Sequence, residues 1–196
     1  MHTEVVHASI TQTASRDVHY ATLMAHAHNT PNNHLLACMI ASWLVGQGNM
    51  PTRFGLSETS WNNLLNNHFP HYIFPQRLLP SDTIDVLRLP ECDELRTLFF
   101  SHCDTITHDK QCLADILITG CMGSDHLWQD LGLWSRKDLT TLMKHNFPSL
   151  AAKNDRDMKW KKFFYKQLCL QEGIYICRAP SCEVCADYQK CFGSEE

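Results

Sequence analysis

The sequence predicts an all-α fold, a helical bundle that ends in a cysteine-rich loop. Apolar residues recur at three- and four-residue steps in several segments, which is the spacing of one face of an α-helix. No segment keeps the two-residue alternation of a half-buried strand for long enough to predict a sheet. We therefore expect a flexible lead-in at residues 1–15, a helical domain at 16–176 and a cysteine loop at 177–196.

Two helices are expected in the first 45 residues. The first begins at Asp17 and carries evenly spaced apolar residues at Tyr20, Leu23, Met24 and Ala27. Pro31 is expected to break this helix because its ring is not tolerated in a helix interior. Asn33 is a favoured N-cap residue and is expected to begin a second helix over 34–45.

Several further helices are expected along the rest of the chain. Ser57 is a favoured N-cap residue and precedes an apolar segment that stops at Pro70. Later helices are expected at 81–89, at 91–102, at 110–119 and, after a cap at Asn154, up to about Gln171. The last of these has apolar side chains on most of its surface, which predicts a largely buried helix that leads into the cysteine loop.

Part of the sequence recurs at an offset of 77 or 78 residues. Ser57 and the residues up to Phe69-Pro70 match the segment from Ser135 to Phe147-Pro148, and Gly55-Leu56 matches Gly132-Leu133. Two copies are too few for a solenoid, which needs three or more. We interpret the copies as two similar helical hairpins packed against each other.

Four cysteines fall within fifteen residues near the end of the chain, with the spacing C-x4-C-x2-C-x5-C. They are Cys177, Cys182, Cys185 and Cys191. No histidine follows His145, so the local donors are all thiolates, which suit soft metals and iron–sulfur clusters. Structural zinc commonly uses two separated pairs of ligands, whereas this loop has a single C-x2-C, so zinc is the weaker alternative.

Composition narrows the class of protein. The 196 residues are 44% apolar and carry a formal charge of −4, which disfavours a general nucleic-acid binder. The longest apolar run, 35–45, is too short for a bilayer, which takes about 20 residues. With no signal peptide at the start, we expect a cytoplasmic protein with six reduced cysteines outside the loop. No P-loop, H-E-x-x-H or G-x-S-x-G motif occurs, which favours a carrier over an enzyme.

The second half of the chain, from about Leu113, resembles one known family. The motifs that carry the resemblance are His126-Leu-Trp, Asp130-Leu-Gly-Leu, Asn146-Phe-Pro, the segment 158–169 and the four-cysteine loop that closes in Cys191-Phe-Gly. Together they are similar to NifQ, and the last forty residues are the most specific part. The cysteine spacing shows no departure from that family.

The resemblance implies a metallochaperone of nitrogen fixation. Such a carrier holds an iron–sulfur cluster that takes up molybdenum, and it donates molybdenum for iron–molybdenum cofactor synthesis. The implied cluster is of the 4Fe–4S type, although the sequence leaves the number of metal atoms open. The ligands carried over are Cys177, Cys182, Cys185 and Cys191. The implied partners are the cofactor scaffold NifEN, the nitrogenase iron protein NifH, and molybdate or another molybdenum donor.

Weaker candidates surround this ligand set. Cys169 lies eight residues before the loop and is a candidate fifth ligand, and His126 is a candidate for the open corner of the cluster. A half-buried thiol and a helix-capping imidazole are their ordinary explanations. The basic residues proposed to gather molybdate or to steer docking are Lys159, Lys162, Lys166 and Arg178, for which a solvated helix face is the ordinary explanation.

Two other classes of helical protein also carry cysteine loops. Helix-hairpin-helix DNA glycosylases end in a similar cluster loop, but residues 120–125 do not match their glycine-rich hairpin and the net charge is negative. The other class is an interaction protein with a structural zinc loop. Duplex binding separates the first alternative, and metal analysis separates the second.

Overall fold

The structure is a computed structural model that describes residues 15–28, 30–75, 90–171, 173 and 188–195. Every regular element in these residues is a helix, which confirms the predicted all-α class. In chain order the elements are α1 (Arg16–Ala25), α2 (Pro31–Leu44), the 3-10 helix η1 (Thr52–Gly55), α3 (Glu58–His68), α4 (Pro90–Ser101), α5 (His108–Cys121), α6 (Leu127–Asp130), α7 (Arg136–Asn146), α8 (Pro148–Ala152), α9 (Trp160–Gln171) and α10 (Tyr188–Phe192).

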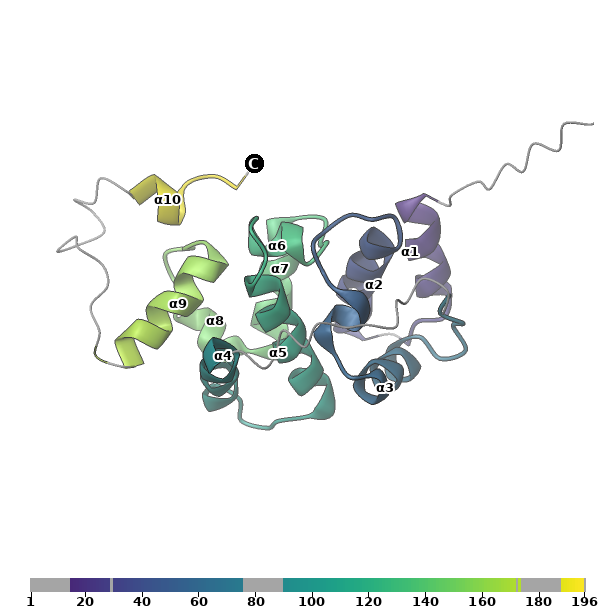
Figure 1. The fold of residues 1–196 in the computed structure, drawn as a ribbon, viewed down its shortest axis with the longest axis horizontal. Coiled ribbons are helices and arrows are strands. Elements are labelled where there is room, and N and C mark those ends of the chain that lie inside the picture. The colour runs from purple at the N-terminus through teal and green to yellow at the C-terminus, as the bar shows by residue number, and fades with distance from the viewer. Residues whose placement is uncertain (1–14, 29, 76–89, 172, 174–187, 196) are drawn as a thin grey trace, which may run out of the picture.

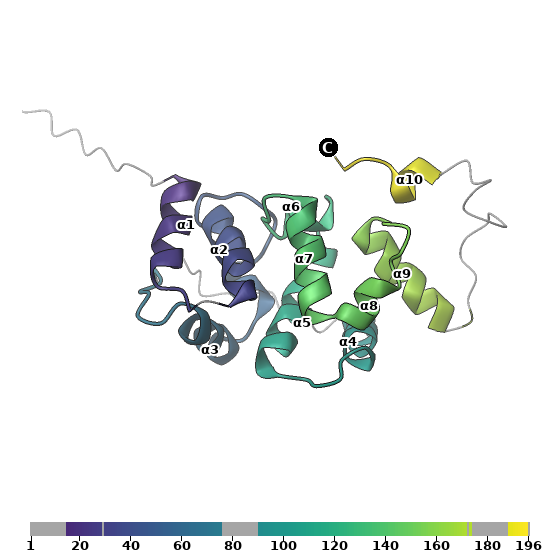
Figure 2. The same ribbon diagram turned by 180° about the vertical axis from the view of Figure 1, so that it is seen from behind.

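The helices form an elongated arrangement with α5, α6 and α7 in the middle. Helices α1 to α3 lie on one side of this middle group, and α8 and α9 lie on the other, in both views (Figures 1 and 2). Helix α10 lies beyond α9, and the described tail after it turns back toward α6 (Figure 1). The end of the chain is therefore close to a helix that lies some 65 residues earlier in the sequence.

Two clusters of aromatic rings fill the core on either side of α5. In the second half, the ring of Phe99 lies 4.8 Å from that of Phe147 and 5.0 Å from that of Phe164. This cluster joins α4, the end of α7 and α9. In the first half, the ring of Trp61 lies 5.2 Å from Phe54 and 5.4 Å from Phe74. Such buried ring contacts contribute beyond the area that they remove from water.

The sequence repeat has a counterpart in the helices. Helices α2 and α5 both have 14 residues, and α3 and α7 both have 11. The hydroxyl of Ser57 accepts a hydrogen bond from the backbone of Ser60, and that of Ser135 accepts one from Asp138, as expected for N-caps.

The two copies also make reciprocal contacts. Helix α2 lies against α7, and α3 lies against α5. A Cβ atom on Gly132 would meet Ser42 of α2 at 2.9 Å, and one on Gly55 would meet Thr119 at the matching place in α5 at 2.5 Å. Contacts exchanged in this way are those of a two-fold relation. The interpretation of each copy as a hairpin stays a prediction.

A pair of buried side chains repeats the same exchange. Asn32 of α2 and Asn146 of α7 form two amide hydrogen bonds of 2.9 and 2.8 Å. At the matching positions, Nε2 of His68 in α3 lies 3.2 Å from a carboxylate oxygen of Asp109 in α5. This is ion-pair distance, but the angle falls outside that of a good hydrogen bond.

Two predicted helix starts were wrong. Helix α2 begins at Pro31, because proline suits the first helical position, where no backbone donor is needed. Asn33 is instead buried, with its side-chain oxygen 2.6 Å from Nδ1 of His68. Helix α9 begins at Trp160, since Asn154 holds a turn through a 2.8 Å hydrogen bond from the backbone N–H of Met158. The predicted helix at 81–89 and the lead-in at 1–14 lie outside the described residues, and the division into domains stays a prediction.

None of the described helices is long and apolar enough to cross a bilayer.

Replacing Gly55 by alanine is expected to lower the free energy of unfolding by about 2–3 kcal/mol. The residue has φ of +80°, which costs an alanine about 1–2 kcal/mol, and the new methyl group would meet Thr119 at 2.5 Å. Urea denaturation at neutral pH measures the loss. Gly46→Ala is the matched control, because Gly46 has φ of +76° with nothing within 4 Å of the added Cβ. Equal losses for both variants would show that the close approach contributes nothing.

The His68–Asp109 pair is expected to make stability depend on pH. Burial lowers the pKa of His68 below its ordinary value of 6.5, and the nearby Asp109 only partly offsets this. The unfolded chain therefore takes up a proton first, so this contribution to stability is complete above pH 6.5 and is lost as the pH falls toward the lower folded-state pKa.

The double variant His68→Asn/Asp109→Asn copies the Asn32–Asn146 pair of the other half. It should retain the fold at pH 7.5 and show a smaller loss of stability between pH 7 and pH 5.5, measured by urea denaturation at each pH. An unchanged slope would rule out His68 as a source of the pH dependence.

Candidate metal centre and the basic cavity beside it

Of the four predicted cluster ligands, Cys191 lies in the described part of the structure. It is a free, half-buried cysteine in the short helix α10. Cys177, Cys182 and Cys185 lie outside the described residues, so the convergence of the four thiols stays a prediction. A four-thiolate donor set suits an iron–sulfur cluster by its chemistry, because soft ligands prefer iron and sulfide over hard cations.

Helix α10 is attached to the start of α9. The backbone N–H of Lys159 donates a 2.8 Å hydrogen bond to the carbonyl of Cys191, and its ammonium group lies 3.4 Å from the carbonyl of Gln189. Within α10, the rings of Tyr188 and Phe192 stack with their centroids 4.6 Å apart. The last predicted ligand is thus fixed to the helix that leads toward the cysteine loop.

The cysteines outside the loop are poorly suited to bind metal. Burial raises the pKa of Cys38 and of Cys121 to about 12 and that of Cys112 to about 11. A thiol binds metal as the thiolate, so a raised pKa disfavours binding. Cys169 is half-buried on α9, and its suggested role as a fifth ligand stays a prediction. The described residues contain no group of three or more histidine, cysteine or carboxylate side chains placed to hold a metal ion.

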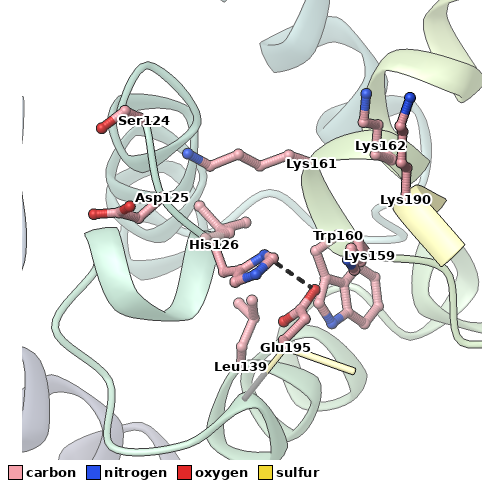
Figure 3. A pocket seen from close by; sticks show the side chains of 11 residues that line it. Ser124, Asp125, His126, Leu139, Lys159, Trp160, Lys161, Lys162, Lys190 and Glu195 are labelled. Carbon is pink, nitrogen blue, oxygen red and sulfur yellow. Dashed lines mark ion pairs between the residues drawn. The ribbon is translucent and has the colours of Figure 1, made fainter. Parts of the chain in front are cut away.

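A cavity of about 230 Å³ opens between the start of α9, α10 and the loop before α6 (Figure 3). Its charged lining residues are Asp125, Lys159, Lys161, Lys162, Lys190 and Glu195. Four lysines face two carboxylates, so the formal charge of the lining is +2 when His126 is neutral. The cavity is therefore suited to an anion by its charge.

Two of the four basic residues proposed from the sequence line this cavity. They are Lys159 and Lys162, whereas Lys166 is exposed one turn further along α9 and Arg178 lies outside the described residues. Lys161 and Lys190 also line it and were missed, because neither falls in the pattern of the other basic residues of α9. Only the packing of α10 against α9 brings Lys190 to the same place.

One of these lysines is anchored by a buried carboxylate. The ammonium group of Lys161 forms an ion pair with Asp130, whose side chain is 1% exposed, and donates to the carbonyl of Gly123 at 2.8 Å. A Cβ on Gly123 would lie 2.3 Å from the carboxylate carbon of Asp130, so the glycine is needed for this approach. The pair joins α9 to α6 beside the cavity.

Glu195 brings the end of the chain into the cavity. Its side chain is 5% exposed, with one oxygen 3.7 Å from Nδ1 of His126 and the other 3.3 Å from Nε of Arg136 (Figure 3). Arg136 also binds Asp157 at 2.5 Å, in the turn before α9. No sequence pattern points to Glu195, because a carboxylate at the end of a chain is ordinarily solvated.

His126 occupies the N-cap position of the four-residue helix α6. Its backbone N–H donates to the side-chain oxygen of Gln129 at 3.3 Å, and its ring lines the cavity (Figure 3). Its suggested role at the open corner of a cluster stays a prediction.

Known proteins similar to this chain form one group. A family model described as NifQ matches residues 35–193. Protein NifQ of Azotobacter vinelandii is 39% identical over 185 residues, which cover 89% of this chain and 94% of the relative. Protein NifQ of Rhodobacter capsulatus is 34% identical and covers 82% of this chain and 87% of the relative. The NifQ homolog of Sinorhizobium fredii is 34% identical, with 84% and 73% covered.

No solved structure shows a significant match to this fold. The family match includes Cys177, Cys182, Cys185 and Cys191, and it extends upstream through most of α2. The relatives cover both the helical part and the cysteine loop at well above 30% identity. The chain belongs to the NifQ family.

Proposed function

We propose that this protein carries a molybdenum–iron–sulfur cluster on Cys177, Cys182, Cys185 and Cys191 and donates molybdenum for the assembly of the nitrogenase iron–molybdenum cofactor. The cluster is cargo of the protein, and no turnover chemistry is assigned to it. The observation that carries the proposal is the four-cysteine loop within a chain that matches NifQ over residues 35–193.

The placement of Cys191 supports this assignment. The thiol is free and half-buried, unlike Cys38, Cys112 and Cys121, whose burial raises their pKa values. A cluster that delivers a metal must keep one metal atom exchangeable, in the way that catalytic zinc keeps an open position. A loop at the edge of the helical part is suited to such exchange.

The charge of the neighbouring surface supports the same proposal. Residues 136–178 contain ten lysines and arginines against four acidic residues, while the rest of the chain is acidic. A basic surface favours both an anionic molybdenum source and an acidic surface of a partner. The proposed recipients are the cofactor scaffold NifEN acting with the nitrogenase iron protein NifH.

Replacing Cys185 or Cys191 by serine should remove the cluster. We expect at least about a tenfold loss in metal affinity, because even residues that only support a ligand cost about 10- to 100-fold when they are replaced. The measurement is iron, molybdenum and sulfide content after anaerobic purification, together with the EPR signal of the cluster.

Cys103→Ser is the control for these variants. Cys103 is another half-buried free cysteine, its pKa is raised by burial, and it follows α4 in the chain, far in sequence from the cysteine loop. Its replacement should leave iron and molybdenum content unchanged. A wild-type protein with one zinc ion per chain and no iron would refute the proposal in favour of a structural zinc loop.

A further inference from the structure

We propose that the cavity beside α10 binds a tetrahedral oxyanion and that the carboxylate of Glu195 fills the anion position until the oxyanion displaces it. Under the proposed function the oxyanion is molybdate, held next to the loop that receives the metal. The identity of the anion rests on that function, whereas the existence of the site rests on the geometry of the cavity.

The size of the cavity suits such an ion. Its volume of about 230 Å³ is several times the ~30 Å³ that one water molecule occupies in the liquid. A metal atom with four oxygens therefore fits with room for some of its water. A folded partner or a long acidic segment does not fit in this volume.

The charges around the cavity favour a dianion. Lys159, Lys161 and Lys162 belong to the residues at the start of α9, where the helix dipole also favours negative charge. Lys190 completes the lining from α10. Once Glu195 has left, four lysines face only Asp125, and the formal charge of the lining rises to +3.

The contacts of Glu195 are those of a displaceable group. Its oxygens lie 3.7 Å from His126 and 3.3 Å from Arg136, and the Nε atom of Arg136 makes no good hydrogen bond among the described atoms. Arg136 keeps Asp157 as a partner when Glu195 moves away. The carboxylate is thus held by charge rather than by close hydrogen bonds, and an anion of higher charge competes with it directly.

The cavity adjoins the proposed cluster ligand. Lys190, which lines the cavity, is the residue before Cys191, and the backbone of Lys159 is bonded to the Cys191 carbonyl at 2.8 Å. An oxyanion in the cavity therefore lies against the helix that carries the last thiol of the loop. The site concentrates the metal source at the place where it is used.

The test is molybdate binding to the full chain by equilibrium dialysis, followed by molybdenum analysis. Lys162→Glu should weaken binding at least about tenfold, and Lys162→Arg should retain it. Lys166→Glu makes the same change in net charge one turn along α9, outside the cavity, and should bind like the wild type. Glu195→Gln should bind about fivefold more tightly, a factor equal to about 1 kcal/mol, because the competing charge is gone.

The same titrations in a Cys185→Ser background separate this site from the cluster. Persistence of the Lys162 and Glu195 effects without a cluster supports an independent oxyanion site. Equal binding by Lys162→Glu and Lys166→Glu would overturn the site, even if the wild type carries molybdenum on its cluster. Unchanged affinity in Glu195→Gln would overturn the displacement by the tail.

Discussion

The buried ion pair between Lys161 and Asp130 is the contact on which the arrangement of the site depends. Asp130 is almost fully buried, so its charge is tolerated only because Lys161 neutralises it. Removing one partner of such a pair typically costs about 3–5 kcal/mol. The backbone carbonyl of Asp130 also accepts a 2.8 Å hydrogen bond from Asn49 of the first half. One residue therefore connects the loop after α2, helix α6 and helix α9.

The duplicated helices provide the frame on which this contact is built. In the first half the matched positions hold His68, and in the second half they hold Asn146, each paired with a residue from the other copy. The close approaches of Gly55 and Gly132 to the opposite helices are equivalent as well. The halves differ in their continuation, because only the second leads through α8 and α9 into the region of the cavity. The frame is symmetric in its contacts, whereas the proposed site belongs to one side.

The proposed carrier and the proposed oxyanion site use the chemistry of different donors. Thiolates bind iron and stabilise a soft cluster, whereas ammonium groups hold a hard oxyanion through charge and hydrogen bonds. A molybdenum source enters as an oxyanion and ends on sulfur, so both kinds of donor are needed close together. The start of α9 provides the lysines, and α10 provides Cys191 beside them.

The sequence by itself determined the all-α class, the caps at Ser57 and Ser135, the repeat and the family, because these depend on local spacing. It also singled out the four cysteines, since their short separation restricts their chemistry wherever the loop lies. Helix starts at Pro31 and Trp160 were misjudged, because proline and asparagine have more than one favourable place near a helix end. Only the tertiary structure brought Glu195 to His126 and Arg136 and placed Lys190 with the lysines of α9. Those contacts join residues far apart in the chain, and the packing of helices, rather than any local pattern, decides which of them meet.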